Sequence, residues 1–142
     1  MHKIWDYQIR INFSEPTARL LRHDPKCAEL APLADVLKRH NATLRCQFDA
    51  FVAYVAEAEK YGIEHYGLYE WTRATLRDPV KEAKYLKSFT VYVGGKEVYP
   101  KGEADTLEAD LKPMVESKTI EKILRYDTNP ANNPQAPQRL DE

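Results

Sequence analysis

A cluster of tyrosine, histidine and glutamate side chains in the middle of the chain has the residue types that acid–base chemistry needs. His65 changes charge near neutral pH and is the natural proton donor or acceptor. Tyr66 and Tyr69 can donate to a developing oxyanion, and on a helix they share one face with Glu70. His65, Tyr66 and Tyr69 are therefore a candidate catalytic or ligand-binding set. A surface helix with packed rings and solvated charges explains the same pattern.

A second set of residues has the donor atoms of a tetrahedral zinc site. Its spacing is His-x3-Cys, a gap of twelve residues, and His-x5-Cys. Neither pair has the two-residue separation of zinc knuckles, and Asp24-Pro25 interrupts the first pair. Buried thiols and surface histidines are the simpler interpretation, so zinc is a weaker alternative and no cofactor is expected. The four ligands in that alternative are His23, Cys27, His40 and Cys46.

Other catalytic and nucleotide-binding patterns are missing from the sequence. None of the three serines lies in a Gly-x-Ser-x-Gly elbow. Gly94-Gly95 falls in a predicted hairpin, whereas phosphate loops join a strand to a helix, and there is no Gly-x-x-x-x-Gly-Lys. The sequence therefore predicts no nucleotide site of a known type.

Length and composition favour one globular domain in a reducing compartment. The chain has 142 residues, of which 43% are apolar, and this suffices for a core. With 21 basic and 22 acidic residues, it lacks the cationic excess of nucleic-acid binders. No apolar run could span a membrane, the N-terminus lacks a signal-peptide layout, and two cysteines make no disulfide framework. We therefore expect a cytoplasmic protein without nucleic-acid or membrane partners.

Three segments are predicted to build the sheet that positions these side chains. Ile4–Phe13 alternates apolar and polar residues, which predicts a strand with one buried face. Ser88–Tyr99 alternates on both sides of Gly94-Gly95, which predicts a tight hairpin. Thr119–Tyr126 fits a strand or a short helix, and we favour a strand. Its inward residues would be Ile120, Leu124 and Tyr126.

Helical periodicity dominates the rest of the chain. Ser14 is a candidate N-cap, Asn41 a left-handed stop, and Asp78-Pro79 a helix start. Leu44–Tyr61 is predicted as one helix on the ground of its length, although Thr43–Phe48 also alternates and could be a strand that leads into a helix. The further predicted helices are one that begins at Ser14-Glu15-Pro16 and is interrupted at Asp24-Pro25, a piece that ends at about His40, Ile63–Leu76, 79–86 and Ala104–Ser117.

These elements predict an α+β fold in which four to five helices cover a small, mostly antiparallel sheet. The order of elements is compatible with ferredoxin-like or thioredoxin-like arrangements, which host many unrelated functions. Residues 1–126 would form the single domain. Residues 127–142, rich in proline and asparagine, would form an extended or disordered tail.

The functional expectation is a small non-catalytic binding or accessory protein that acts through protein–protein interfaces, as a homodimer or as a subunit of a larger assembly. Nine tyrosines, a balanced charge and the missing catalytic signatures favour it. Pairing with another chain would also protect Ile4–Phe13 if that strand lay at a sheet edge. The alternative is an enzyme or small-molecule binder with a pocket between the sheet and the helix that carries His65, Tyr66 and Tyr69.

Overall fold

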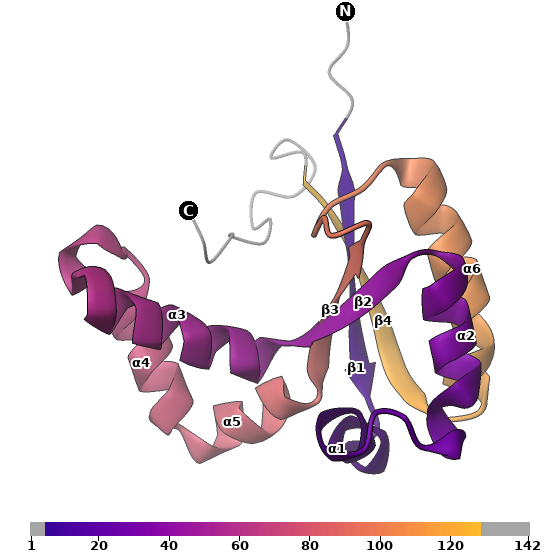
Figure 1. Cartoon of the computed structure of the whole chain (residues 1–142), viewed down its shortest axis with the longest axis horizontal. Coiled ribbons are helices and arrows are strands. Elements are labelled where there is room, and N and C mark those ends of the chain that lie inside the picture. The colour runs from indigo at the N-terminus through magenta and orange to yellow at the C-terminus, as the bar shows by residue number, and fades with distance from the viewer. Residues whose placement is uncertain (1–4, 129–142) are drawn as a thin grey trace, which may run out of the picture.

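The structure, a computed structural model, describes residues 5–128, which form a four-stranded antiparallel sheet and six α-helices (Figure 1). This confirms the α+β class. The predicted tail, 127–142, lies almost entirely outside the described residues. The strands are β1 (Tyr7–Phe13), β2 (Ala42–Cys46), β3 (Ser88–Val93) and β4 (Ile120–Asp127). The helices are α1 (Glu15–His23), α2 (Ala31–Arg39), α3 (Gln47–Tyr61), α4 (Tyr69–Arg77), α5 (Pro79–Leu86) and α6 (Lys101–Glu116), with 3-10 turns η1 (Ala28–Leu30) and η2 (Ile63–His65).

The strand order is β2-β3-β1-β4, and every pairing is antiparallel. With helices crossing between β1 and β2 and between β3 and β4, this is the ferredoxin-like arrangement. The thioredoxin-like alternative is wrong, because it requires parallel neighbouring strands. The expectation that β1 lies at an edge is also wrong. It is a central strand, because the chain returns twice to pair with it, and the edges are β2 and β4.

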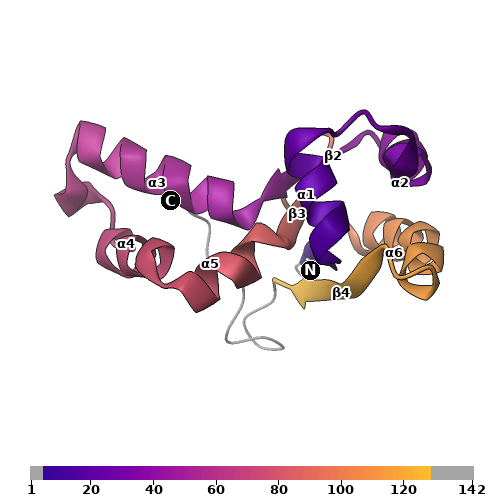
Figure 2. The same ribbon diagram turned by 90° about the horizontal axis from the view of Figure 1, so that it is seen from below.

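The main core lies between one face of the sheet and two helices. The alternation of β1 sends Ile9, Ile11 and Phe13 to this face, and all three are fully buried. Helices α2 and α6 cover the face together, as two views of the ribbon show (Figures 1 and 2). Their contributions to the core include Leu33 and Val36 from α2 and Leu107 and Leu111 from α6.

The opposite face of the sheet is polar. Register fixes its composition, because residues directly opposite each other in a ladder point to the same face. Arg10 of β1 pairs with Thr90 of β3 on one side and with Leu124 of β4 on the other. Thr90 in turn pairs with Arg45 of β2. The sheet therefore has an apolar face under α2 and α6 and a second face that includes two arginines.

Residues 47–86, which we call the arm, are inserted between β2 and β3. Helices α3, α4 and α5 of the arm extend away from the sheet in both ribbon views (Figures 1 and 2). The main core cluster contains none of the buried side chains of the arm, such as Phe51, Tyr54 and Tyr69. The arm therefore has an interior of its own.

The predicted helix Leu44–Tyr61 is wrong over its first three residues. Ala42–Cys46 forms β2, whose Leu44 and Cys46 pair with Val91 and Phe89 of β3, and α3 begins at Gln47. The competing interpretation, a short strand that leads into a helix, is the correct one. The length argument failed because the strand passes into the helix without a glycine or proline to mark the boundary.

Two further element predictions need correction. Ile63–Leu76 is not one helix, since a 3-10 turn at 63–65 is followed by α4 from Tyr69. The Gly94-Gly95 turn is confirmed, with φ of 58° and 79°. Its return segment is not a strand, however, because it makes only isolated bridges, Val93 with Lys96 and Tyr7 with Tyr99.

The C-terminal strand is confirmed, but two of its three predicted inward residues point the other way. Ile120 is buried in the core, and it pairs with Phe13. The register then shifts between Asn12 and Phe13, so that a bulge changes the face that each later residue occupies. Leu124 and Tyr126 therefore lie on the polar face.

The predicted helix boundaries agree well with the structure where capping chemistry marks them. The Ser14 hydroxyl accepts from the Thr17 N–H, and the Asp78 carboxylate accepts from the N–H groups that open α5. Asn41 has a φ of 51° after α2. Among the described helices, none is both long and apolar enough to cross a membrane.

Candidate interaction surface on the helical arm

The arm is attached to the sheet at both of its ends. Its first helix, α3, follows β2 directly at Gln47 and ends at Gly62, where φ is 112°. A side chain at position 62 would be strained and would meet the Glu64 carboxylate, so glycine allows the sharp turn into η2. After α4, Asp78 caps α5, which leads back to β3. Because β2 and β3 are neighbours, the chain leaves the sheet after the edge strand β2, forms the arm and returns to the adjacent strand β3.

The interior of the arm is small and partly polar. Phe51, Tyr54 and Ala58 of α3 are buried, as are Tyr69 and Thr72 of α4. The Tyr54 hydroxyl accepts from the main-chain N–H of Leu68 at 3.0 Å. This hydrogen bond fixes the segment before α4 against α3.

Among residues 5–128, the large apolar side chains that are mostly exposed lie on the arm. In the described part of the chain, each large hydrophobic residue in the exposed class lies between positions 52 and 80. Exposed apolar side chains that gather into a patch often mark an interaction surface. We call this set the arm surface. Its members are Val52 (45% exposed), Tyr61 (61%), Ile63 (45%), Trp71 (48%) and Val80 (79%).

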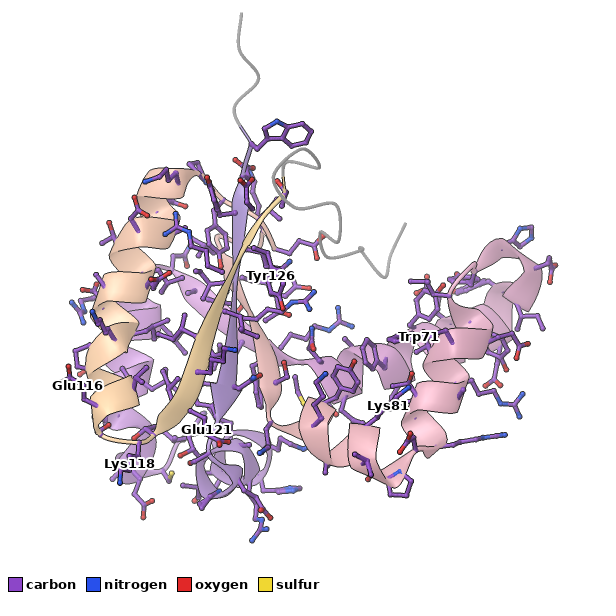
Figure 3. All side chains as sticks on the ribbon, turned by 180° about the vertical axis from the view of Figure 1, so that it is seen from behind. Trp71, Lys81, Glu116, Lys118, Glu121 and Tyr126 are labelled. Atoms are coloured by element: carbon purple, nitrogen blue, oxygen red, sulfur yellow. The ribbon has the colours of Figure 1, made fainter. Side chains whose placement is uncertain are left out.

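The side chain of Trp71, labelled on the arm in Figure 3, packs against another aromatic ring of the arm. Its ring makes an edge-to-face contact with Phe51, with centroids 5.8 Å apart. Phe51 makes a second such contact with Tyr85 of α5, at 4.9 Å. Trp71 therefore belongs to a cluster of edge-to-face aromatic contacts that joins all three helices of the arm. A rigid aromatic side chain of this kind loses little entropy when a partner covers it.

His65 and the two tyrosines predicted to act with it make their contacts with different residues. His65 lies in η2, where its side chain is 71% exposed and 3.6 Å from the Glu64 carboxylate. Tyr66 precedes α4, so it does not share a helix face with Tyr69. The ring of Tyr66 packs edge-on against Tyr54 instead. The predicted pocket between His65 and the sheet has no support in this arrangement, because η2 lies on the arm, away from the sheet (Figure 1).

Both tyrosines of that set are poorer acids than usual. Desolvation, followed by a hydrogen bond with Glu57, raises the pKa of Tyr66. The hydrogen bond to Glu59, at 2.8 Å, and then desolvation raise the pKa of Tyr69. Each hydroxyl holds its proton more firmly than a free tyrosine. Their contacts serve the arm's own packing.

The four residues of the zinc alternative are also separate. His40 at the end of α2 contacts Asp110 of α6, with Nε2 2.7 Å from the carboxylate. The Cys46 thiol is buried beside the main-chain carbonyls of Tyr85 and Leu86, and Cys27 and Cys46 are both free. Among the described residues, no three histidine, cysteine or acidic side chains are grouped so as to hold a metal ion.

Comparison with known proteins adds no relative to this picture. No family model, curated protein or solved structure matches the chain.

Sequence reasoning missed the arm surface because helical periodicity assigns Val52 to the same stripe as Phe51, whereas the structure exposes Val52 and buries Tyr54. The signal that could have found it is the density of aromatic residues between positions 47 and 86.

Proposed function

We propose that this protein is a non-catalytic binding or accessory protein that acts through a protein–protein interface on the arm. One observation carries the proposal: the exposed large apolar side chains of the described residues all lie on the arm. Covering such side chains removes apolar area from water, at about 25 cal/mol per Å². Aromatic residues, here Trp71 and Tyr61, are also enriched in interfaces.

The position of the arm supports the same proposal. Its helices add nothing to the strand order of the sheet, and they have their own interior. The arm can therefore present a binding surface without disturbing the main core, which lies between the sheet and helices α2 and α6. The free thiols Cys27 and Cys46 agree with the reducing, cytoplasmic location expected from the sequence. The partner is either a second copy of this chain or another subunit of a larger assembly.

Site-specific photo-crosslinking in the cells that produce the protein tests the proposal. Benzoyl-phenylalanine replaces Trp71 or Val80 in the full chain, and Arg19 serves as the control position because it is exposed on α1, outside the arm. We expect discrete covalent adducts from positions 71 and 80. An adduct of twice the chain mass identifies self-association, and any other discrete mass identifies a different subunit.

A second variant shows whether the adducts depend on the arm surface. Val52→Asp places a charge on an exposed position of α3 and should leave the melting temperature unchanged. It should reduce the adduct yield from position 71 about tenfold, the effect of losing about 1.4 kcal/mol of binding free energy. The proposal fails if positions 71 and 80 crosslink no more than position 19.

A further inference from the structure

The polar face of the sheet carries several basic side chains. The ladders place two arginines on this face, Arg10 on β1 and Arg45 on β2, with Thr90 of β3 between them. Lys122 of β4 lies opposite Asn12 on the same face. Among the residues that the ladders place on this face, none is an aspartate or a glutamate, while Glu121 lies at the bulge of β4 beside Lys122. The positions are Gln8, Arg10, Asn12, Thr43, Arg45, Ser88, Thr90, Tyr92, Lys122, Leu124 and Tyr126.

Buried amides hold the guanidinium of Arg10 in place. Its Nε donates to the Gln8 side-chain oxygen at 2.6 Å. The hydrogen bonds also set the orientation of the Gln47 amide, whose oxygen accepts from Arg10 Nη1 at 2.9 Å while its nitrogen donates to the Ser88 hydroxyl at 3.1 Å. Gln8, Gln47 and Ser88 are each at most 8% exposed. The guanidinium is therefore fixed before any ligand arrives.

An aromatic ring lies against the same guanidinium. The ring centroid of Tyr126, labelled on β4 in Figure 3, is 4.9 Å from Arg10 Cζ. Stacking of this kind leaves the in-plane N–H groups of an arginine available for hydrogen bonds. Gln8 and Gln47 accept from Nε and Nη1, and the Tyr126 hydroxyl also makes a hydrogen bond with the guanidinium. A guanidinium has five N–H groups and Arg10 is only partly buried, so the remaining N–H groups can meet a ligand.

The positive charge of Arg10 is poorly compensated. The side chains that hold it, two amides and a phenol ring, are neutral. The ion pairs formed among the described residues do not include Arg10. Burial lowers the pKa of Arg10, and this effect is opposed only in part, first by the charge and hydrogen bond of the Tyr126 phenol and then by the charge of Glu97. A partly buried guanidinium without a carboxylate in contact gains stability from an added anion.

We propose that Arg10 is the centre of an oxyanion-binding site, which takes a small molecule that joins one carboxylate or phosphate group to an aromatic body. The planar N–H groups match the oxygens of either anion. The aromatic body would lie beside Tyr126 and would extend toward Tyr85 of the arm, whose phenol is near enough to Arg10 to interact with it electrostatically. The site does not depend on the proposed interface, because its anion contacts involve none of the arm-surface residues.

The test is an NMR titration of the full-length protein with phenyl phosphate and with phenylacetate, at constant ionic strength and neutral pH. The reporter is the side-chain Nε–H signal of Arg10, which is assigned by its loss in Arg10→Lys. We expect a saturable shift with a dissociation constant of about 1 mM or lower for at least one probe. Arg10→Gln should weaken binding about tenfold or more, whereas Arg19→Gln, with the same charge change on exposed α1, should leave it within about twofold.

A further variant keeps the test decisive if Arg10→Gln disturbs the fold. Tyr126→Leu retains Arg10 and removes the ring that lies against it, on an edge strand. It should weaken phenyl phosphate binding about three- to tenfold and leave inorganic phosphate binding unchanged. The inference is overturned if neither probe gives a saturable shift in the wild-type protein, or if Arg19→Gln weakens binding as much as Arg10→Gln. Unchanged binding of phenyl phosphate to Tyr126→Leu would exclude the aromatic part of the site.

Discussion

The hydroxyl of Tyr99 accepts a hydrogen bond from the main-chain N–H of Ile9, at 2.9 Å, inside the core. The same hydroxyl donates to the carbonyl of Val91 on β3, at 3.0 Å. The ladder between β1 and β3 extends only from Asn12 to Arg10, and its register would next bring Ile9 opposite Val91. The side chain of Tyr99 therefore bridges the two strands at the point where their main-chain pairing stops.

Tyr99→Phe should be strongly destabilising, although it keeps the ring. Loss of the hydroxyl leaves the Ile9 N–H and the Val91 carbonyl buried, and both residues are fully inaccessible to solvent. Each unsatisfied group costs about 1–3 kcal/mol, so the two groups together should lower the free energy of unfolding by about 2–6 kcal/mol. Urea denaturation measures it. Tyr92→Phe on β3 is the matched control, with an expected change within about 0.5 kcal/mol. Equal effects of the two changes would contradict this role of the hydroxyl.

Tyr99 should also make the protein sensitive to alkali. Burial raises the pKa of Tyr99 above its ordinary value of 10.0. Above that pH the unfolded chain releases the phenol proton while the folded chain keeps it, so the unfolded state binds fewer protons. Stability is therefore complete below pH 10 and falls as the pH rises, by up to about 1.4 kcal/mol per pH unit from this residue.

Urea denaturation from about pH 9 to pH 11 measures this slope. Tyr99→Phe should show a shallower decline than the wild-type protein. Some decline should remain in the variant, because the pKa values of Tyr66 and Tyr69 are raised as well. Parallel curves for the two proteins would show that Tyr99 ionises equally easily in the folded and unfolded states.

Local sequence patterns correctly predicted where most strands lie, but they did not predict which strands pair with each other. The alternation in β1 correctly separates Ile9 and Ile11 from Gln8 and Arg10. It says nothing about partners, and for that reason β1 was expected at an edge, whereas β3 and β4 flank it. Pairing is decided by residues far along the chain, and the bulge beside Phe13 then moves Tyr126 to the polar face. No local signal in β4 encodes that shift.

The candidate sites were harder to predict for a related physical reason. Sequence reasoning selected His65 because of its chemistry, but its position in η2 leaves it exposed and apart from the sheet. It overlooked Arg10, whose partners Gln47 and Tyr126 come from α3 and β4. A residue type shows what a side chain can do. The surroundings that make an arginine a binding site are assembled by tertiary structure.

Two threonines of α4 should respond in opposite ways to the same substitution. Thr72 and Thr75 are both buried, at 0% and 2% exposure. The Thr75 hydroxyl donates to the main-chain carbonyl of Trp71 at 2.8 Å, whereas the Thr72 hydroxyl has no hydrogen-bond partner among the described residues. Valine has nearly the same shape as threonine, and both are β-branched, so helix propensity changes little.

Thr72→Val should leave the protein unchanged or more stable by up to about 1 kcal/mol, because it removes a hydroxyl that is buried without compensation. Thr75→Val should destabilise it by about 1 kcal/mol, because it removes a hydrogen bond. Urea denaturation of the two variants in parallel measures the difference, and each serves as the control for the other. A loss of stability in Thr72→Val equal to that in Thr75→Val would mean that a buried water satisfies the Thr72 hydroxyl. In that case the interior of the arm would be hydrated between α3 and α4.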